Sequence, residues 1–149
     1  MTQTIIVADD HPLFRAALKQ AVSQAVPDAK TVEVDSIKAL QAAVESHPDA
    51  DLVLLDLNMP GAHGFSGLVF MRGQYPGLPV VVVSGSEEMQ VMRRSIDYGA
   101  SGFIPKSAPL PTITEAIQAV LEGDVWLPEG VADKIERMQV MSKEEIEAM

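Results

Sequence analysis

The sequence predicts an α/β protein with a doubly wound, five-stranded parallel sheet, and three observations lead to this prediction. Five short apolar runs have the length of strands that are buried on both faces of a sheet. Five segments with apolar residues at helical spacing alternate with these runs, as in the βαβ units of parallel sheets. Polar residues follow most of the runs, at the sheet edge where open α/β sheets place their ligand crevice.

The expected strands are the runs 4–8, 31–34, 52–55, 79–83 and 102–105. The fourth run is the clearest, because it contains four consecutive valines and β-branched residues favour strands. The third run is followed by Asp56 and then by the turn sequence Met59-Pro60-Gly61. Pro105 limits pairing at the end of the fifth run, because proline has no backbone N–H.

The expected helices begin and end at recognisable signals. Pro12 suits the first helical position, where no intrahelical donor is lost, and Ser36 is placed to cap the second helix. The third helix is expected over residues 64–75. Ser86, followed by two glutamates, is expected to open the fourth helix, and Gly123 to close the fifth.

Composition narrows the class of protein. The 149 residues suit one compact domain with a short appendage, and 47% of them are hydrophobic, which is enough for a core. The absence of cysteine excludes disulfides, thiolate catalysis and zinc–thiolate sites. The net charge of −10 argues against nucleic-acid binding by this chain itself. No apolar run approaches a membrane span and no leader is evident, so we expect a cytoplasmic protein without membrane contact.

The C-terminal tail differs from the rest. We expect a first domain over residues 1–124 and a partly helical linker over 125–141. A capping-box pattern begins at Ser142, so residues 142–149 are expected to open another, truncated domain.

Carboxylate, hydroxyl and ammonium groups follow four of the five strands. Asp9 and Asp10 follow the first, Asp56 the third, Ser84 the fourth and Lys106 the fifth. Parallel strands place all these ends along one edge, and clustered carboxylates predict a divalent cation because they repel one another without it. Ligands that are only oxygens favour magnesium over zinc. Ser84 and Lys106 suit a phosphoryl group carried by Asp56, which needs a hydrogen-bond donor and a cation.

Taken singly, each of these residues also has an ordinary explanation as a helix cap, a loop hydroxyl or a solvated charge, so the joint placement carries the prediction. The three histidines, His11, His47 and His63, lie on different loops without ligand spacing and are expected to be exposed. The glycines of 61–67 lack the spacing of a dinucleotide-binding fingerprint.

The set of strand-end residues, in this order, resembles the response-regulator receiver domain of two-component signalling, over residues 4–123. The phrases DDHPLFRAALK and DYGASGFIPKS further resemble receivers that precede a LuxR-type (NarL/FixJ-like) helix-turn-helix domain. The resemblance implies the flavodoxin-like (CheY-like) fold, with strand order 2-1-3-4-5 and five helices. Residues 142–149 would then begin the helix-turn-helix domain, most of which is expected to be missing.

The resemblance also implies roles at the site. Asp56 would be the nucleophile that takes a phosphoryl group from a sensor histidine kinase. Asp10 and Asp56 would bind Mg²⁺ directly, Asp9 through water and Asn58 through its backbone carbonyl, with Mn²⁺ as a possible substitute.

Three further residues would form the switch. Ser84 and Lys106 would contact the phosphoryl group, and Phe103 would follow Ser84 and change the surface of helix 4, strand 5 and helix 5. Such a protein is a signalling switch with self-phosphorylation and self-dephosphorylation activity rather than a metabolic enzyme. It would form a homodimer through receiver helices and contact DNA only through the C-terminal domain, to control transcription.

Two departures from the family pattern and two alternatives stand beside this hypothesis. Ser107 occupies the position after the lysine where many receivers have proline, and Phe103 stands where tyrosine is commoner. A haloacid-dehalogenase-like phosphotransferase would need a second aspartate two residues after Asp56, and that position is Asn58. An interaction module without phosphate chemistry would not need the acidic residues and Lys106.

Overall fold

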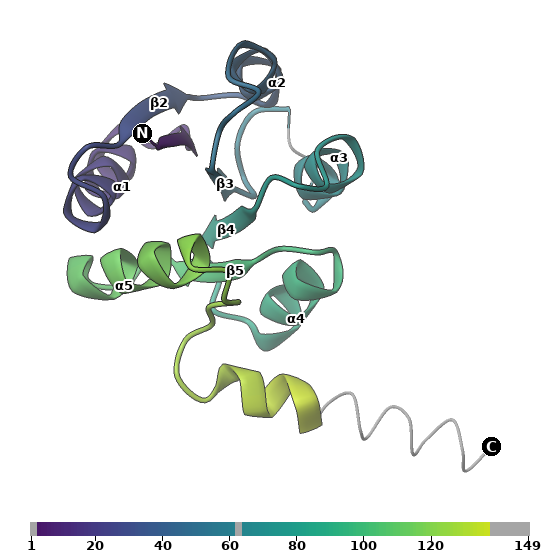
Figure 1. Cartoon of the computed structure of the whole chain (residues 1–149). Coiled ribbons are helices and arrows are strands. Elements are labelled where there is room, and N and C mark those ends of the chain that lie inside the picture. The colour runs from purple at the N-terminus through teal and green to yellow at the C-terminus, as the bar shows by residue number, and fades with distance from the viewer. Residues whose placement is uncertain (1–2, 62–63, 138–149) are drawn as a thin grey trace.

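A computed structural model describes residues 3–61 and 64–137 and shows one five-stranded parallel sheet with helices on both faces (Figure 1). The strand order is β2-β1-β3-β4-β5, which confirms the predicted fold. The strands are β1 (Thr4–Ala8), β2 (Lys30–Val34), β3 (Leu52–Asp56), β4 (Val80–Ser84) and β5 (Gly102–Pro105). The helices between and after them are α1 (Pro12–Ala25), α2 (Ile37–Ser46), α3 (Ser66–Gln74), α4 (Met89–Asp97) and α5 (Leu110–Leu121).

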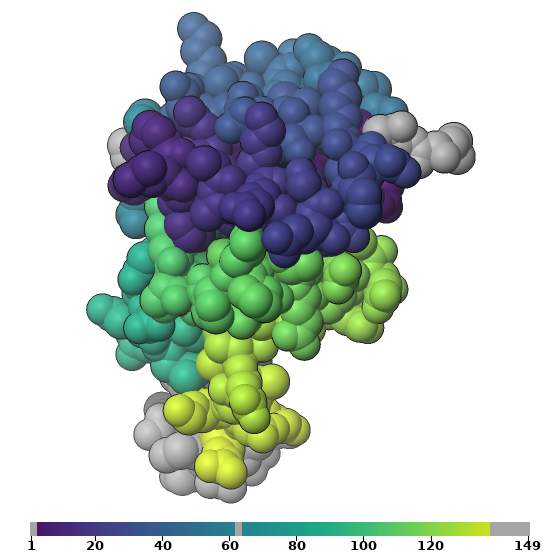
Figure 2. Space-filling model, turned by 90° about the vertical axis from the view of Figure 1, so that its left-hand side faces the viewer, coloured from purple at the N-terminus to yellow at the C-terminus, as the bar shows by residue number. Residues whose placement is uncertain are grey.

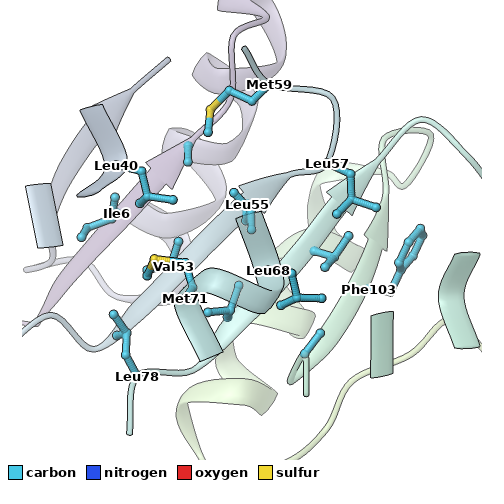
Figure 3. Close-up of a cluster of buried hydrophobic side chains, with 14 of the residues drawn as sticks. Ile6, Leu40, Val53, Leu55, Leu57, Met59, Leu68, Met71, Leu78 and Phe103 are labelled. Atoms are coloured by element: carbon cyan, nitrogen blue, oxygen red, sulfur yellow. The ribbon is translucent and has the colours of Figure 1, made fainter. Parts of the chain in front are cut away.

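The sheet separates two hydrophobic cores, because successive side chains of a strand point to opposite faces. On one face, α1 and α5 lie side by side and cover Ile5, Val7 and their neighbours (Figures 1 and 2). On the other face, α2, α3 and α4 cover a second cluster that includes Leu55, Leu68 and Phe103 (Figure 3). β1, β3, β4 and β5 are buried along their whole length, so the apolar runs of the sequence follow from burial on both faces.

Two predicted helix starts are confirmed and two are wrong. Pro12 opens α1, and the Ser36 hydroxyl caps α2 by accepting a hydrogen bond from the Ala39 amide at 3.1 Å. α3 begins at Ser66 rather than Gly64, which has a left-handed φ of +62° that a right-handed helix cannot use. Ser86 does not open α4.

The reason for the late start of α4 is local. The Ser86 hydroxyl accepts from the Glu88 amide at 3.2 Å and so forms a turn within the loop. The helix then begins at Met89, after the extended residue Glu88.

Beyond α5 the chain turns back and packs against the sheet. Trp126 lies beside β5: its amide donates to the Ser101 carbonyl at 3.0 Å, and its carbonyl accepts from the Phe103 amide at 3.1 Å. Residues 131–137 form a short helix, as predicted for part of this segment, and Val131 and Ile135 are buried against the α2–α4 side of the core. The boundary of the linker at residue 141 and the capping box at Ser142 lie outside the described residues.

Gly102 is required at the contact between β5 and the C-terminal segment. A Cβ atom at this position would stand 2.9 Å from the Trp126 carbonyl oxygen, closer than such atoms normally approach. We expect Gly102→Ala to lower the free energy of unfolding by about 1–3 kcal/mol, because either the strand or the segment must shift. Urea unfolding monitored by circular dichroism measures this change.

Gly73→Ala in α3 is the matched control, since a Cβ there meets no atom within 4 Å. It should leave stability unchanged or raise it by about 0.5–1 kcal/mol, because alanine favours the helix. Equal stability of the two variants would mean that the Trp126 contact does not hold the segment in place.

Candidate functional site

The ends of four strands bring the predicted polar residues to one edge of the sheet. Asp56 is the last residue of β3 and lies opposite Val83 of β4. Asp9 follows β1, which pairs with β3 as far as Ala8 and Leu55. Lys106 follows β5 at the same edge. In each case a polar residue ends or follows an apolar strand. Because the strands are parallel, their carboxyl ends lie at the same edge of the sheet, and the polar side chains gather there.

Lys106 connects the carboxylates of β1 and β3. Its Nζ atom lies 3.1 Å from Asp56 Oδ2 and 3.3 Å from Asp9 Oδ2. Its side chain is only 18% exposed, and its ammonium also stands 5.1 Å from the centre of the Phe14 ring. This single cation therefore partly neutralises two carboxylates that are both fully buried.

The main chain orients the two buried carboxylates. The Asn58 amide donates to Asp56 Oδ1 at 3.0 Å, and the His11 amide donates to Asp9 Oδ1 at 2.7 Å. In each case the donor lies two residues after the acceptor, in the turn that leaves the strand. One oxygen of each carboxylate is thus held by the chain, and the other points to Lys106.

Two carboxylate oxygens of the site are buried and accept no hydrogen bond. They are Asp9 Oδ2 and Asp10 Oδ1. Ligand atoms of Asp9, Asp10, His11 and Asp56 all lie within 4.8 Å of one another. Lys106 Nζ lies 3.3 Å from Asp9 Oδ2 but forms no hydrogen bond with it. Because buried oxygens that accept no hydrogen bond are costly, this arrangement fits a bound cation, and a set of carboxylate oxygens is the chemistry that Mg²⁺ prefers.

Ser84, Phe103 and Asn58 lie close by in the fold but outside this charged cluster. The Ser84 hydroxyl is buried at the end of β4 and accepts from the Ser86 amide at 3.1 Å. Phe103 is fully buried in the core shown in Figure 3. Asn58 is exposed on the loop after β3.

His11 is exposed, as the sequence predicts, but its ring also lies beside Asp9, Asp10 and Asp56, which the absence of ligand spacing among the histidines did not predict. Its side chain is 61% exposed, yet its Nδ1 atom lies 2.9 Å from Lys106 Nζ. The signal in the sequence was its position directly after Asp9 and Asp10, which places it at the start of α1 and over the acidic edge.

A further hydrogen bond joins the two loops that flank Ser84 and Lys106. The Ser107 hydroxyl donates to Glu87 Oε1 at 2.7 Å. The peptide bond between Lys106 and Ser107 is trans, as are all the others in residues 3–61 and 64–137.

Fold and site together define a signalling domain. Residues 5–118 match the response regulator receiver domain, and the chain therefore belongs to this family of two-component signalling proteins. Over 124 residues it is 44% identical to the glycerol metabolism activator of Pseudomonas putida, covering 83% of this chain and 56% of that protein. It is 32% identical to the nitrate/nitrite response regulator protein NarL of Escherichia coli strain K12, covering 86% of this chain and 59% of NarL.

Solved structures of response regulators have a fold similar to that of this chain. A LuxR family DNA-binding response regulator from Silicibacter pomeroyi is 31% identical with a TM-score of 0.74, and the match covers 85% of this chain and 98% of that one. The isolated receiver domain of RcsB from Salmonella enterica shares the fold with a TM-score of 0.78 at 22% identity, covering 89% of this chain and 98% of that one. The chain spans less than two thirds of the length of the curated relatives named here. Among the described residues, no helix is long and apolar enough to cross a membrane.

The proximity of the Asp9, Asp10 and Asp56 carboxylates leads to a prediction about the stability of the folded protein. Asp10→Asn should raise the free energy of unfolding in EDTA by about 1 kcal/mol, because it removes one of the mutually repelling charges. With saturating Mg²⁺ the wild type should instead be more stable than Asp10→Asn, because a cation that binds the folded wild-type site stabilises it by mass action. Thermal unfolding in the two buffers measures both effects.

Asp28→Asn serves as the control, because this exposed aspartate lies in the loop after α1 and outside the cluster. It removes the same charge without removing a proposed ligand, so its difference from the wild type should not depend on Mg²⁺. If Asp10→Asn behaves like this control, Asp10 takes no part in cation binding.

Proposed function

We propose that the chain is a phosphorylation-activated response regulator that accepts a phosphoryl group from a sensor histidine kinase on Asp56. The observation that carries the proposal is the contact of Asp56 Oδ2 with Lys106 Nζ at 3.1 Å, beside two buried carboxylate oxygens that lack hydrogen-bond donors. Membership of the receiver family supports it, because receiver domains of response regulators work with histidine kinases.

The transfer itself requires little from the protein beyond position and charge. A carboxylate oxygen of Asp56 attacks phosphorus, the bond from phosphorus to the kinase imidazole nitrogen breaks, and an acyl phosphate forms. Lys106 stands at the Asp56 oxygen and can pair with the phosphoryl oxygens, which attract an ammonium strongly. Attack by water on the acyl phosphate then restores Asp56 and releases phosphate, which is the proposed self-dephosphorylation.

Mg²⁺ would be held by Asp10, Asp56 and the backbone carbonyl of Asn58, with Asp9 acting through water, and Mn²⁺ could replace it. When bound, the ion supplies the positive charge that lets an anionic phosphoryl group approach three carboxylates. The buried oxygens of Asp9 and Asp10 are the structural support for this assignment.

Ser84 and Phe103 are the proposed switch. In the described conformation the Ser84 hydroxyl accepts from the Ser86 amide at 3.1 Å, which leaves its own proton to donate to a phosphoryl group on Asp56. Phe103 would then follow Ser84 and change the surface formed by α4, β5 and α5. Because the Phe103 amide is hydrogen-bonded to the Trp126 carbonyl, the change at β5 has a direct connection to the C-terminal segment.

The proposed output lies beyond the receiver. We assign residues 1–124 to the receiver, 125–141 to a linker and 142–149 to the start of a helix-turn-helix domain. One relative is named as an activator and a similar solved protein as DNA-binding, which supports control of transcription through that domain. Homodimerisation through receiver helices completes the proposal.

Phosphorylation of Asp56 can be tested by intact-protein mass spectrometry. Incubation with acetyl phosphate and Mg²⁺ should add the mass of one phosphoryl group to the wild type, and EDTA should prevent the addition. Asp56→Asn should show no addition, because the amide cannot form the acyl phosphate, whereas Asp28→Asn should be modified like the wild type. Modification of Asp56→Asn would show that another residue is the acceptor.

The connection from Phe103 to Trp126 predicts a spectroscopic signal. Mg²⁺ with beryllofluoride, which mimics the phosphoryl group, should change the fluorescence of Trp126, the single tryptophan of the chain. Asp56→Asn should abolish this change, and Ser84→Ala should reduce it while leaving binding of the mimic measurable. An unchanged spectrum in the wild type would contradict the proposed output route.

A further inference from the structure

We propose that the His11 imidazole acts as a plug in the cation basin of the metal-free receiver, so that the ring has to leave before Mg²⁺ binds. The basin is defined by the carboxylates of Asp9, Asp10 and Asp56. The inference rests on the proposed function, since it concerns the same metal site, but it assigns a role to a residue that the chemistry of phosphoryl transfer does not use. Its consequence is that His11 lowers the affinity of this receiver for Mg²⁺.

The position of one ring atom carries the inference. His11 Nδ1 lies 3.2 Å from an oxygen of Asp10, 3.3 Å from an oxygen of Asp9 and 3.6 Å from Asp56 Oδ2. An ion that binds carboxylates of this cluster must stand between them, at about 2.0–2.1 Å from each oxygen for Mg²⁺. The ring nitrogen occupies the space among the same three carboxylates, so ion and ring compete for it.

The contacts of the ring are contradictory, which makes it a poor substitute for an ion. Lys106 has only N–H groups to offer, so at 2.9 Å Nδ1 must accept a hydrogen bond from it. A nitrogen that accepts a hydrogen bond from Lys106 carries no proton to donate to the oxygens of Asp9 and Asp10. Its lone pair therefore repels these negatively charged oxygens. If Nδ1 carries a proton instead, that proton competes with the ammonium of Lys106. A divalent cation satisfies the carboxylates without this conflict.

The ring can leave without disturbing the helix that follows it. The His11 side chain makes no capping hydrogen bond to α1. The main chain of His11 is held separately, because its amide donates to Asp9 Oδ1 at 2.7 Å and its carbonyl accepts from the Arg15 amide at 2.8 Å. The side chain is 61% exposed, so a rotation about its own bonds takes the ring into solvent.

Departure of the ring also affects Lys106. The 2.9 Å contact with Nδ1 is lost, whereas Lys106 Nζ keeps its ion pairs with Asp9 and Asp56 at 3.3 and 3.1 Å and its position over the Phe14 ring. The ammonium is then available to a phosphoryl group on Asp56. Entry of the metal and loss of the contact between His11 and Lys106 are therefore coupled in this receiver.

Calorimetric titration with MgCl₂ at one fixed pH tests the plug directly. His11→Ala and His11→Asn should bind Mg²⁺ about three- to fivefold more tightly than the wild type, the scale expected for loss of weak, partly exposed contacts. Both substitutions keep the main-chain hydrogen bonds of residue 11, and circular dichroism in EDTA checks that the variants are folded. His47→Ala, a histidine substitution at the end of α2, should leave the Mg²⁺ affinity unchanged.

Nuclear magnetic resonance of the ring gives a second readout that does not depend on activity. The His11 ring signals should move on addition of Mg²⁺ with the same apparent dissociation constant as the calorimetric titration, towards the values of a ring in solvent. The His47 signals should not move.

The outcomes separate this inference from the proposed function. Weaker Mg²⁺ binding by both His11 variants would make His11 a ligand and overturn the plug, and an affinity equal to that of His47→Ala would overturn it as well. Asp10→Asn tests the metal site itself: if it binds Mg²⁺ as tightly as the wild type, the proposed site is wrong whatever His11 does.

Discussion

The repulsion among three carboxylates at one edge of the sheet is the constraint on which the rest of this receiver depends. Two unit charges 4 Å apart repel by about 4 kcal/mol at an effective dielectric constant of 20, and here two of the three groups are fully buried. Burial of β1, β3, β4 and β5 along their whole length holds these residues together despite that cost. Lys106 offsets part of the repulsion, and the remainder favours a bound cation.

The same strands that assemble the site also connect it to distant parts of the molecule. β5 carries Lys106 at its end and Phe103 within it, and the main chain of Phe103 is bonded to Trp126. The strand that places Lys106 at the sheet edge is therefore hydrogen-bonded to the C-terminal segment. Gly102 permits this contact because it lacks the Cβ atom that would meet the Trp126 carbonyl.

His11 shows how a residue next to a functional motif can regulate it without taking part in the chemistry. Its backbone amide orients Asp9, while its ring lies over the site and contacts Lys106. Main chain and side chain thus have opposite effects on the metal-binding state: the first orients a carboxylate near the proposed ion, and the second stands in the space that the ion needs.

The sequence by itself determined the class of fold and the positions of the reactive groups. The apolar runs ended at Asp9, Asp56 and Lys106, and a parallel sheet brings the ends of its strands to one edge. The pattern of apolar and charged residues was therefore sufficient to predict that these three side chains lie at the same edge. The strand order did not follow from periodicity and came from the resemblance to receivers. The starts of α3 and α4 were misplaced because a positive φ at Gly64 and a hydrogen bond of Ser86 are local details that hydrophobic spacing does not contain.

Only the tertiary structure decided how side chains meet across the loops. The ring of His11 approaches Lys106, 95 positions away, and this contact depends on the rotamers of two side chains on different loops. The pairing of Trp126 with β5 likewise needs an open strand edge, and no pattern around residue 126 identifies that edge. Periodicity records which residues are buried, whereas the partners of exposed and half-exposed groups are set by three-dimensional packing.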